Sequence, residues 1–273
     1  MLERRGTLSW VEASARAIRA AEDGFMIYDK LAHGWREKVR YAESCSLLEY
    51  LQRNAEASRI YLQPDGSPLD LGQWFRNPDY GASLRQLADK GPEDFYTVEL
   101  AAHMSADIAA NGGFVTAEDF ASYAVRDTPP VVGTYRGHTI ASATAPHGGP
   151  TLLAILNIVE GWDLAALVHN STEYIYRLGM AMKAAFADRN RHLADPAFVD
   201  VPVDWMISKA RVAEWRAHID AGKSIEAMPV MTGAPTTTQV TVVDKHGNCV
   251  SLTHSARRPA SSRPAWASCT TTR

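Results

Sequence analysis

The sequence predicts an α+β fold that is mostly helical and carries a short antiparallel sheet. Apolar residues recur at helical spacing between polar caps and Gly or Pro stops from Thr7 to about Leu193. The spacing changes to strand-like alternation at Val131–Ile140, and again at Gln239–Val243 and Cys249–Thr253. With 273 residues and 46% hydrophobic composition, the chain can bury a sizeable core.

The first part of the chain predicts three helices and a turn. The first helix is expected from Thr7 to about Gly24, with Ser9 as its cap. Two more are expected at Leu31–Arg40 and Ser46–Asn54. The segment Gln63–Pro68 predicts a turn, because its Pro and Gly residues fix backbone angles that neither a helix nor a strand adopts.

Further helices and a hairpin follow. Asn77-Pro78-Asp79 opens a helix at Tyr80–Lys90, and another amphipathic helix is expected at Phe95–Ala110. Thr116 and Asp119 have the spacing of a capping box at the start of a short helix. Alternation around a Gly turn then predicts a β-hairpin at Val131–Ile140.

A glycine-rich loop, Ala145–Thr151, precedes a helix expected at Leu152–Gly161. Free N–H groups in such a loop could hold an anion. The loop lacks the Lys-Ser/Thr pair of a phosphate-binding motif, and Pro150 is a good first residue for a helix. We therefore interpret it as a structural helix start.

The longest helix is expected at Ser171–Leu193, followed by a helix from Arg211 and a linker to Pro235. Asp188 and His192 are four residues apart and could be metal ligands, but this spacing is more typical of a surface pair, so we expect a structural role. The residues expected to face the core are Tyr174, Leu178, Met182, Ala185 and Phe186.

Composition excludes several classes of partner. A formal net charge of -3, from 28 basic and 31 acidic residues, gives no electrostatic case for nucleic acid or an anionic membrane surface. No apolar run approaches the length of a membrane span. The cysteines, Cys45, Cys249 and Cys269, lack metal or disulfide spacing, so we expect free thiols and neither a metal nor a cofactor.

A threonine cluster, Thr236-Thr237-Thr238, stands directly before the strand at Gln239–Val243. This places a hydroxyl group where the first strand of a sheet begins. If the peptide bond before such a threonine is cut, its freed α-amine can act as general base to its own hydroxyl. The alternative is an ordinary hairpin with a threonine-rich approach, since Thr is a good strand former.

The segment Thr236–Asp244, with Gly247-Asn248 and Ser251 in register, resembles the processing site of the γ-glutamyltransferase (glutathione hydrolase) family. Precursors of that family cut themselves before a Thr-Thr-His/Gln-x-Ser/Thr-Val-Val-Asp segment. The resemblance extends over Arg5–Ser255. It implies a fragment of an N-terminal-nucleophile αββα sandwich, with Thr237 as catalytic nucleophile and Ser255 as a second, supporting hydroxyl.

The resemblance also implies a reaction. The expected activity is cleavage of γ-glutamyl amides such as glutathione through a threonine acyl-enzyme, after autoproteolysis before Thr237. The partners would be this small-molecule substrate and the large and small chains of one precursor. Two alternatives stay open, namely a related acylase that acts on another amide, and a non-catalytic helical remnant.

The resemblance divides the chain into residues 1–236, from the large-chain region, residues 237–255, which begin the small-chain region, and a tail. The tail, residues 256–273, has no Gly, Val, Ile or Leu, which predicts disorder and suggests an out-of-frame sequence, with a natural tail as the alternative. Arg257 stands where the family has a substrate-holding Asn. The family's carboxylate-binding arginine and its oxyanion-hole Gly-Gly pair would lie outside the chain, so we expect a truncated member, active or inactive.

The compartment is weakly determined by the sequence. The start of the chain, Met1–Gly6, lacks the apolar core of a secretion signal, so we expect a cytoplasmic chain as written. The family often carries an export signal further upstream, which would instead make the protein periplasmic or secreted.

Overall fold

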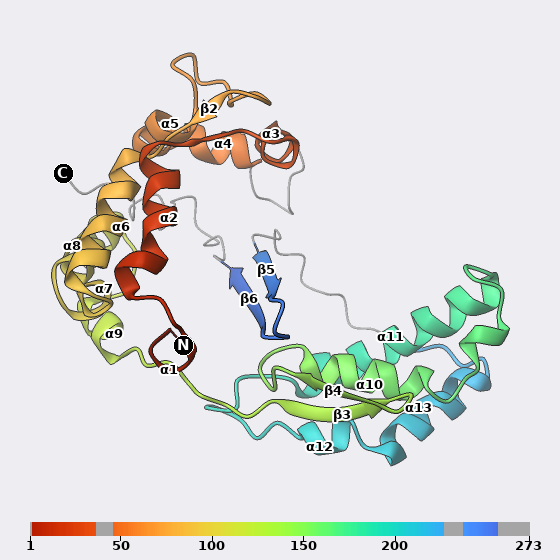
Figure 1. The fold of residues 1–273 in the computed structure, drawn as a ribbon. Helices are drawn as coiled ribbons and strands as arrows, with labels where there is room; N and C mark the ends of the chain where they lie inside the picture. Colours follow the sequence, from red (N-terminus) through yellow and green to blue (C-terminus); the bar gives the residue numbers. More distant parts are fainter. Residues whose placement is uncertain (1, 37–45, 227–236, 256–273) are drawn as a thin grey trace. The chain divides into compact units, whose positions relative to one another are not determined.

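The computed structural model describes residues 2–36, 46–226 and 237–255 (Figure 1). The described residues form two compact units, of which the first comprises residues 2–36, 46–124 and 237–255 and the second residues 125–226. In the described part of the first unit the elements are α1 (Leu2–Arg5), α2 (Trp10–Glu22), β1 (Phe25–Met26), α3 (Asp29–Arg36), α4 (Leu47–Gln52), α5 (Ala55–Tyr61), β2 (Trp74–Phe75), α6 (Pro78–Lys90), α7 (Glu93–Thr97), α8 (Glu99–Ala110), α9 (Ala117–Ser122), β5 (Thr237–Val243) and β6 (Cys249–Ser255).

Side-chain caps fix several helix starts where the sequence predicts them. Ser9 caps α2, Ser46 caps α4 and Thr116 caps α9, each through a capping box with the acid three residues on. Asn77 caps α6 by accepting a hydrogen bond from the backbone N–H of Tyr80 at 3.0 Å. These polar signals are local, so they can be recognised without knowledge of the tertiary structure.

The helix predicted at Phe95–Ala110 is in fact two helices, α7 and α8. The break lies at Val98, whose φ of -117° and ψ of -128° are not helical. The buried carboxylate of Asp94 accepts hydrogen bonds from the backbone N–H of Glu99 at 3.1 Å and from the side chain of Gln86 at 2.8 Å. Asp94 therefore satisfies a free N–H group at the start of α8, which a continuous helix would not present.

Helix α1 and two further features of the first unit are absent from the sequence prediction. Helix α5 follows directly on α4, and its start is capped by Asn54, whose side chain accepts from the N–H of Ala57 at 2.8 Å. Strands β1 and β2 pair antiparallel, with Phe25 opposite Phe75. A two-residue strand shows too little alternation to be recognised from the sequence.

In the second unit, whose residues are described up to 226, a β-hairpin packs against a helical group. Strands β3 and β4 pair from Val131, opposite Ser142, to a tight turn in which Arg136 and Gly137 have φ values of 48° and 81°. The elements are β3 (Val131–Tyr135), β4 (His138–Ser142), α10 (Gly149–Val159), a short 3-10 helix (Leu164–Ala166), α11 (Thr172–His192), α12 (Val203–Met206) and α13 (Lys209–Asp220).

Helices α10, α11 and α13 enclose the core of the second unit (Figure 1). Helix α11 contributes small residues to it, including the fully buried Ala181 and Ala184. The expected core position Ala185 is buried, but Met182 is 45% exposed, so the prediction for Met182 is wrong. Because alanines let neighbouring helices approach closely, the buried face of α11 is made of small side chains rather than the large ones that a hydrophobicity pattern selects.

The glycine-rich loop before α10 meets another part of the backbone. A Cβ atom on Gly149 would lie 2.1 Å from the carbonyl oxygen of Ala143, a distance that real Cβ atoms do not reach. The N–H of Gly149 also donates to that carbonyl at 3.1 Å. Gly149 thus has a packing role, in agreement with the interpretation of this loop as a structural helix start.

Candidate active site

Strands β5 and β6 form an antiparallel hairpin whose turn is organised by Asp244. Its carboxylate accepts hydrogen bonds from the backbone N–H groups of His246 at 2.8 Å and Asn248 at 2.9 Å, and from the Asn248 side chain at 2.8 Å. These bonds, above all the one from the Asn248 side chain, lower the pKa of Asp244. Gly247 has a φ of 82°, which a side chain would disfavour.

The two residues predicted for catalysis lie opposite each other in the strand register, at the open end of this hairpin. Thr237 is the first residue of β5, Ser255 is the last of β6, and the two are Cα partners in the strand register. The position of Thr237 at the start of a strand agrees with the prediction. The pairing with Ser255 follows from the register, which sequence reasoning did not use, although the hydroxyl spacing around the Asp244–Asn248 turn could have indicated it. Thr236 lies outside the described residues.

A polar network covers the face of the hairpin that belongs to the odd-numbered positions. The Gln239 amide nitrogen donates to Ser251 Oγ at 2.6 Å, and the Gln239 amide oxygen accepts from the Thr253 hydroxyl. The hydroxyls of Thr241 and Ser251 lie 3.2 Å apart and share a further hydrogen bond. Gln239 therefore links two hydroxyls of the neighbouring strand.

The middle even-numbered positions of the hairpin form an apolar face, with Thr238 and His254 on the same side toward the open end. Val240, Val242, Val250 and Leu252 are each at least half exposed, and all the hairpin side chains that the structure describes are exposed. Burial therefore contributes little to the hairpin, which is held by its backbone ladder and by the turn at Asp244.

Asp188, considered above as a metal ligand, has a different partner. It is only 2% exposed, and its carboxylate accepts two hydrogen bonds from Arg211, at 2.9 and 2.7 Å, and one from Trp215 Nε1 at 2.7 Å. The structural role that we expect is therefore correct, but the surface pair with His192 is wrong. His192 instead makes an edge contact with Trp205, with ring centroids 5.1 Å apart.

The Arg211 guanidinium is held on two further sides. It lies over the rings of Trp205 and Trp215, at 4.7 and 4.5 Å from their centroids. Hydrogen bonding to Asp188 is the main cause that raises the pKa of Arg211. Within the residues that the structure describes, no group of three His, Cys, Asp or Glu side chains has the geometry to hold a metal ion.

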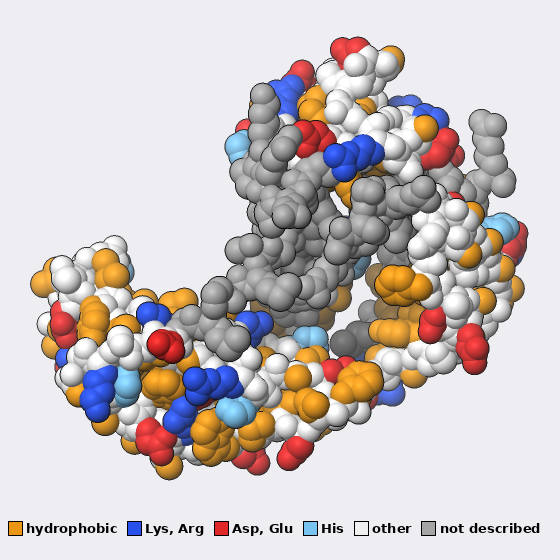
Figure 2. All heavy atoms as spheres, turned by 180° about the vertical axis from the view of Figure 1, so that it is seen from behind, with side chains coloured by type: hydrophobic (Ala, Val, Ile, Leu, Met, Phe, Trp, Pro, Cys, Tyr) orange, Lys and Arg blue, Asp and Glu red, His pale blue; other side chains and the backbone are white. Residues whose placement is uncertain are grey.

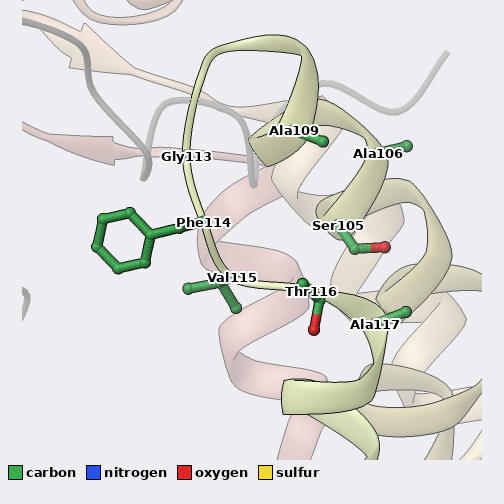
Figure 3. A pocket seen from close by; sticks show the side chains of 8 residues that line it. All are labelled: Ser105, Ala106, Ala109, Gly113, Phe114, Val115, Thr116 and Ala117. Carbon is green, nitrogen blue, oxygen red and sulfur yellow. The ribbon is translucent and has the colours of Figure 1, made fainter.

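A shallow hollow in the first unit, about 300 Å³ in volume, lies beside the segment that joins α8 to α9 (Figure 3). Its lining is mostly apolar and includes Ala106, Ala109, Phe114 and Val115. The hydroxyl of Thr116, which also lines it, is engaged with Asp119 in the capping box. The lining contains no acid, base or cysteine, so its two hydroxyls, Ser105 and Thr116, have no base in the hollow to activate them.

The described surface shows three further features. Basic and acidic side chains are interspersed on the face shown in Figure 2. Among the described helices, none is both long and apolar enough to cross a membrane. Cys249 is a free, exposed thiol, whereas Cys45 and Cys269 lie outside the described residues.

Comparison with known proteins identifies the family. A model of the family described as gamma-glutamyltranspeptidase matches residues 1–264. The chain belongs to this family. The match covers both described units and the complete β5–β6 hairpin, and it extends nine residues beyond Ser255, into the predicted tail.

Relatives within the family carry two kinds of name. The chain is 36% identical over 255 residues to the acylase ACY 1 proenzyme of Pseudomonas sp. (strain SE83), covering 92% of this chain and 44% of the relative. It is 32% identical over 260 residues to the glutathione hydrolase proenzyme of Escherichia coli (strain K12), covering 93% and 43%. The chain thus spans less than half of the length of these curated relatives.

A solved structure supports the fold assignment. The crystal structure of Helicobacter pylori gamma-glutamyltranspeptidase aligns with a TM-score of 0.73 and 31% sequence identity, over 84% of this chain and 62% of that one. The predicted α+β architecture of an N-terminal-nucleophile hydrolase is thereby confirmed for the part of the fold that this chain contains.

Proposed function

We propose that this chain belongs to a γ-glutamyltransferase, or glutathione hydrolase, whose nucleophile is Thr237. The observation that supports the proposal best is the pairing of Thr237 with Ser255 at the open end of a hairpin lined with hydroxyl groups. Membership of the gamma-glutamyltranspeptidase family supports the class of reaction. Similarity to a protein named as a glutathione hydrolase proenzyme supports both the substrate class and a processing step.

The proposed first step is autoproteolysis. The Thr237 hydroxyl attacks the carbonyl carbon of Thr236, so that the acyl group moves from the Thr237 nitrogen to its oxygen and forms an ester. Water then hydrolyses the ester, which leaves a carboxylate on Thr236 and a free α-amine on Thr237. Processing thus creates the general base that the later reaction needs.

The proposed second step uses the freed amine. It accepts the proton of the Thr237 hydroxyl, whose oxygen attacks the carbonyl of a γ-glutamyl amide. The amine product leaves with a proton, and a γ-glutamyl ester remains on Thr237. Water, or the amino group of an acceptor, then takes the acyl group and restores the hydroxyl. Ser255, on the paired strand, would hold the Thr237 oxygen by a hydrogen bond.

A second candidate is a related acylase that acts on another amide, and the 36% identity to acylase ACY 1 proenzyme favours it. Both candidates use the same nucleophile and differ in the acyl group. Hydrolysis of γ-glutamyl p-nitroanilide and glutaryl p-nitroanilide, which differ only by the α-amino group, separates them. A preference of about tenfold or more for the γ-glutamyl compound is expected. The reverse preference would favour the acylase.

The role of Thr237 is tested by substitution in the same chain. Thr237→Ala is expected to abolish processing and to reduce turnover by at least about a thousandfold, because it removes the nucleophile. Thr237→Ser keeps a hydroxyl and should still be processed. Ser255→Ala should slow processing about tenfold through loss of one hydrogen bond. A wild-type chain that is neither cut nor active would instead indicate a non-catalytic remnant.

A further inference from the structure

The polar network of the β5–β6 hairpin occupies its middle, between the turn and the end that holds Thr237 and Ser255. The odd-numbered cross-strand pairs are, in order, Val243 with Cys249, Thr241 with Ser251, Gln239 with Thr253, and Thr237 with Ser255. The hydrogen bonds of the network join the second and third of these pairs. The Gln239–Thr253 pair is therefore the direct neighbour of the proposed catalytic pair.

Gln239 is the only amide among the hydroxyl side chains of this network, and both ends of its amide group are used. Its oxygen accepts the hydrogen of the Thr253 hydroxyl, and its nitrogen donates to Ser251, which is diagonal to it on β6. The first of these bonds fixes the direction of the Thr253 hydroxyl hydrogen, so the remaining lone pairs of Thr253 can only accept. Ser251 accepts from Gln239 and shares its bond with the Thr241 hydroxyl, in which either oxygen can be the donor.

We propose that Gln239 is a positioning residue for the Thr237–Ser255 pair. Gln239 holds the Thr253 hydroxyl in one orientation next to that pair. It thereby determines which groups donate and which accept hydrogen bonds on the side of the hairpin that carries the proposed nucleophile. The network is exposed to water, where such hydrogen bonds add little to stability. Its effect is therefore expected on the rate of processing rather than on folding. This inference rests on the proposed function.

Three substitutions at Gln239 probe this role. Gln239→Asn shortens the side chain by one methylene and breaks both hydrogen bonds, so processing before Thr237 should slow about tenfold. Gln239→His keeps one donor and one acceptor and should restore processing to within about threefold of wild type. Gln239→Glu accepts from Thr253 but cannot donate to Ser251, and should also process slowly. Val240→Thr, on the opposite face of the same strand, is the matched control and should behave as wild type.

Gln239→Glu also provides a readout that a purely structural role would not change. A carboxylate two residues along the strand from the freed Thr237 amine favours the ammonium form and so raises the pKa of that amine. Because the neutral amine is the proposed base, the acid limb of the pH profile for γ-glutamyl p-nitroanilide hydrolysis should move upward by about half a pH unit. Gln239→His, which is mostly neutral there, should leave the limb in place.

The experiment follows the intact mass of the purified 273-residue chain and its variants over time, together with their unfolding midpoints. Slow cutting of Gln239→Asn, rescue by Gln239→His and unchanged midpoints would support the inference. If the wild-type chain is cut and Gln239→Asn is cut at the same rate, the role of Gln239 is overturned while the proposed function stands. The role of Gln239 is also overturned if Gln239→Asn and Gln239→His are both cut more slowly and both unfold at a lower midpoint. An uncut wild type would overturn the proposed function, and this inference with it.

Discussion

The helical core of the second unit and the β5–β6 hairpin are stabilised in opposite ways. In the former, α10, α11 and α13 bury one another's apolar side chains and enclose the Asp188–Arg211 pair. In the hairpin, every described side chain is exposed, and those of the apolar face are at least half exposed. The residues that determine stability are thus separate from those proposed for chemistry, so substitutions in the two regions should change different measurements.

The largest effect on stability is expected from Asp188→Ala. It leaves the Arg211 guanidinium, which is mostly buried, without its carboxylate partner, and it removes the acceptor of Trp215 Nε1. We expect a loss of about 3 kcal/mol in the free energy of unfolding, measured by urea denaturation. Glu214→Ala is the control, because Glu214 contacts the same Arg211 from an exposed position and should cost less than about 1 kcal/mol. Equal losses would contradict the account.

The second effect concerns the alanine face of α11. Ala184→Leu adds a large side chain at a fully buried position and should lower the free energy of unfolding by about 2 kcal/mol. Met182→Leu, on the exposed side of the same helix, should change it by less than about 0.5 kcal/mol. A larger loss for Met182→Leu than for Ala184→Leu would show that the sequence prediction of the core face was right after all.

The same substitution in both regions sharpens the comparison further. Val159→Thr places a hydroxyl at a position that is 3% exposed, and should cost about 1.5 kcal/mol in unfolding free energy. Val242→Thr does so on the exposed face of the hairpin, at 57% exposure, and should cost less than about 0.5 kcal/mol. Similar costs would mean that the apolar face of the hairpin is covered in solution.

The smallest effect is a pH dependence confined to the hairpin turn. The pKa of Asp244 is lower in the folded state, chiefly because of the Asn248 side chain. The carboxylate therefore stabilises the turn at any pH above the unfolded-state pKa, and this stabilisation is lost as the pH falls through the folded-state pKa. Amide exchange of Asn248 should therefore become less protected, relative to its intrinsic rate, below about pH 4. Asp244→Asn should abolish this pH dependence, and its persistence in that variant would contradict the assignment to Asp244.

Local polar signals made much of this fold predictable. Ser9, Asn77 and Thr116 mark helix starts correctly, because a cap is satisfied within a few residues along the chain. The break at Val98 was not predicted, although the N–H that follows it bonds to Asp94, only five residues back along the chain. The burial of Asp188 was not predictable from local signals, because its partner Arg211 is 23 residues away and the pair forms only in the tertiary structure.

For the site, the threonine cluster and the turn between the strands are local features of the sequence, whereas the choice of Thr237 and of Ser255 rested on the family resemblance. The register of the hairpin then showed that the two residues are partners. The network around Gln239 could not be read from residue types alone, since its bond to Ser251 is diagonal and depends on which side chains share a face.

The most direct test of the account is the intact mass of the purified chain, compared with that of Thr237→Ala. We predict that the wild-type chain separates into residues 1–236 and 237–273, that the second fragment begins with a free threonine amine, and that Thr237→Ala stays whole. A wild-type chain that stays whole, or a Thr237→Ala chain cut at the same bond, would contradict Thr237 as the nucleophile.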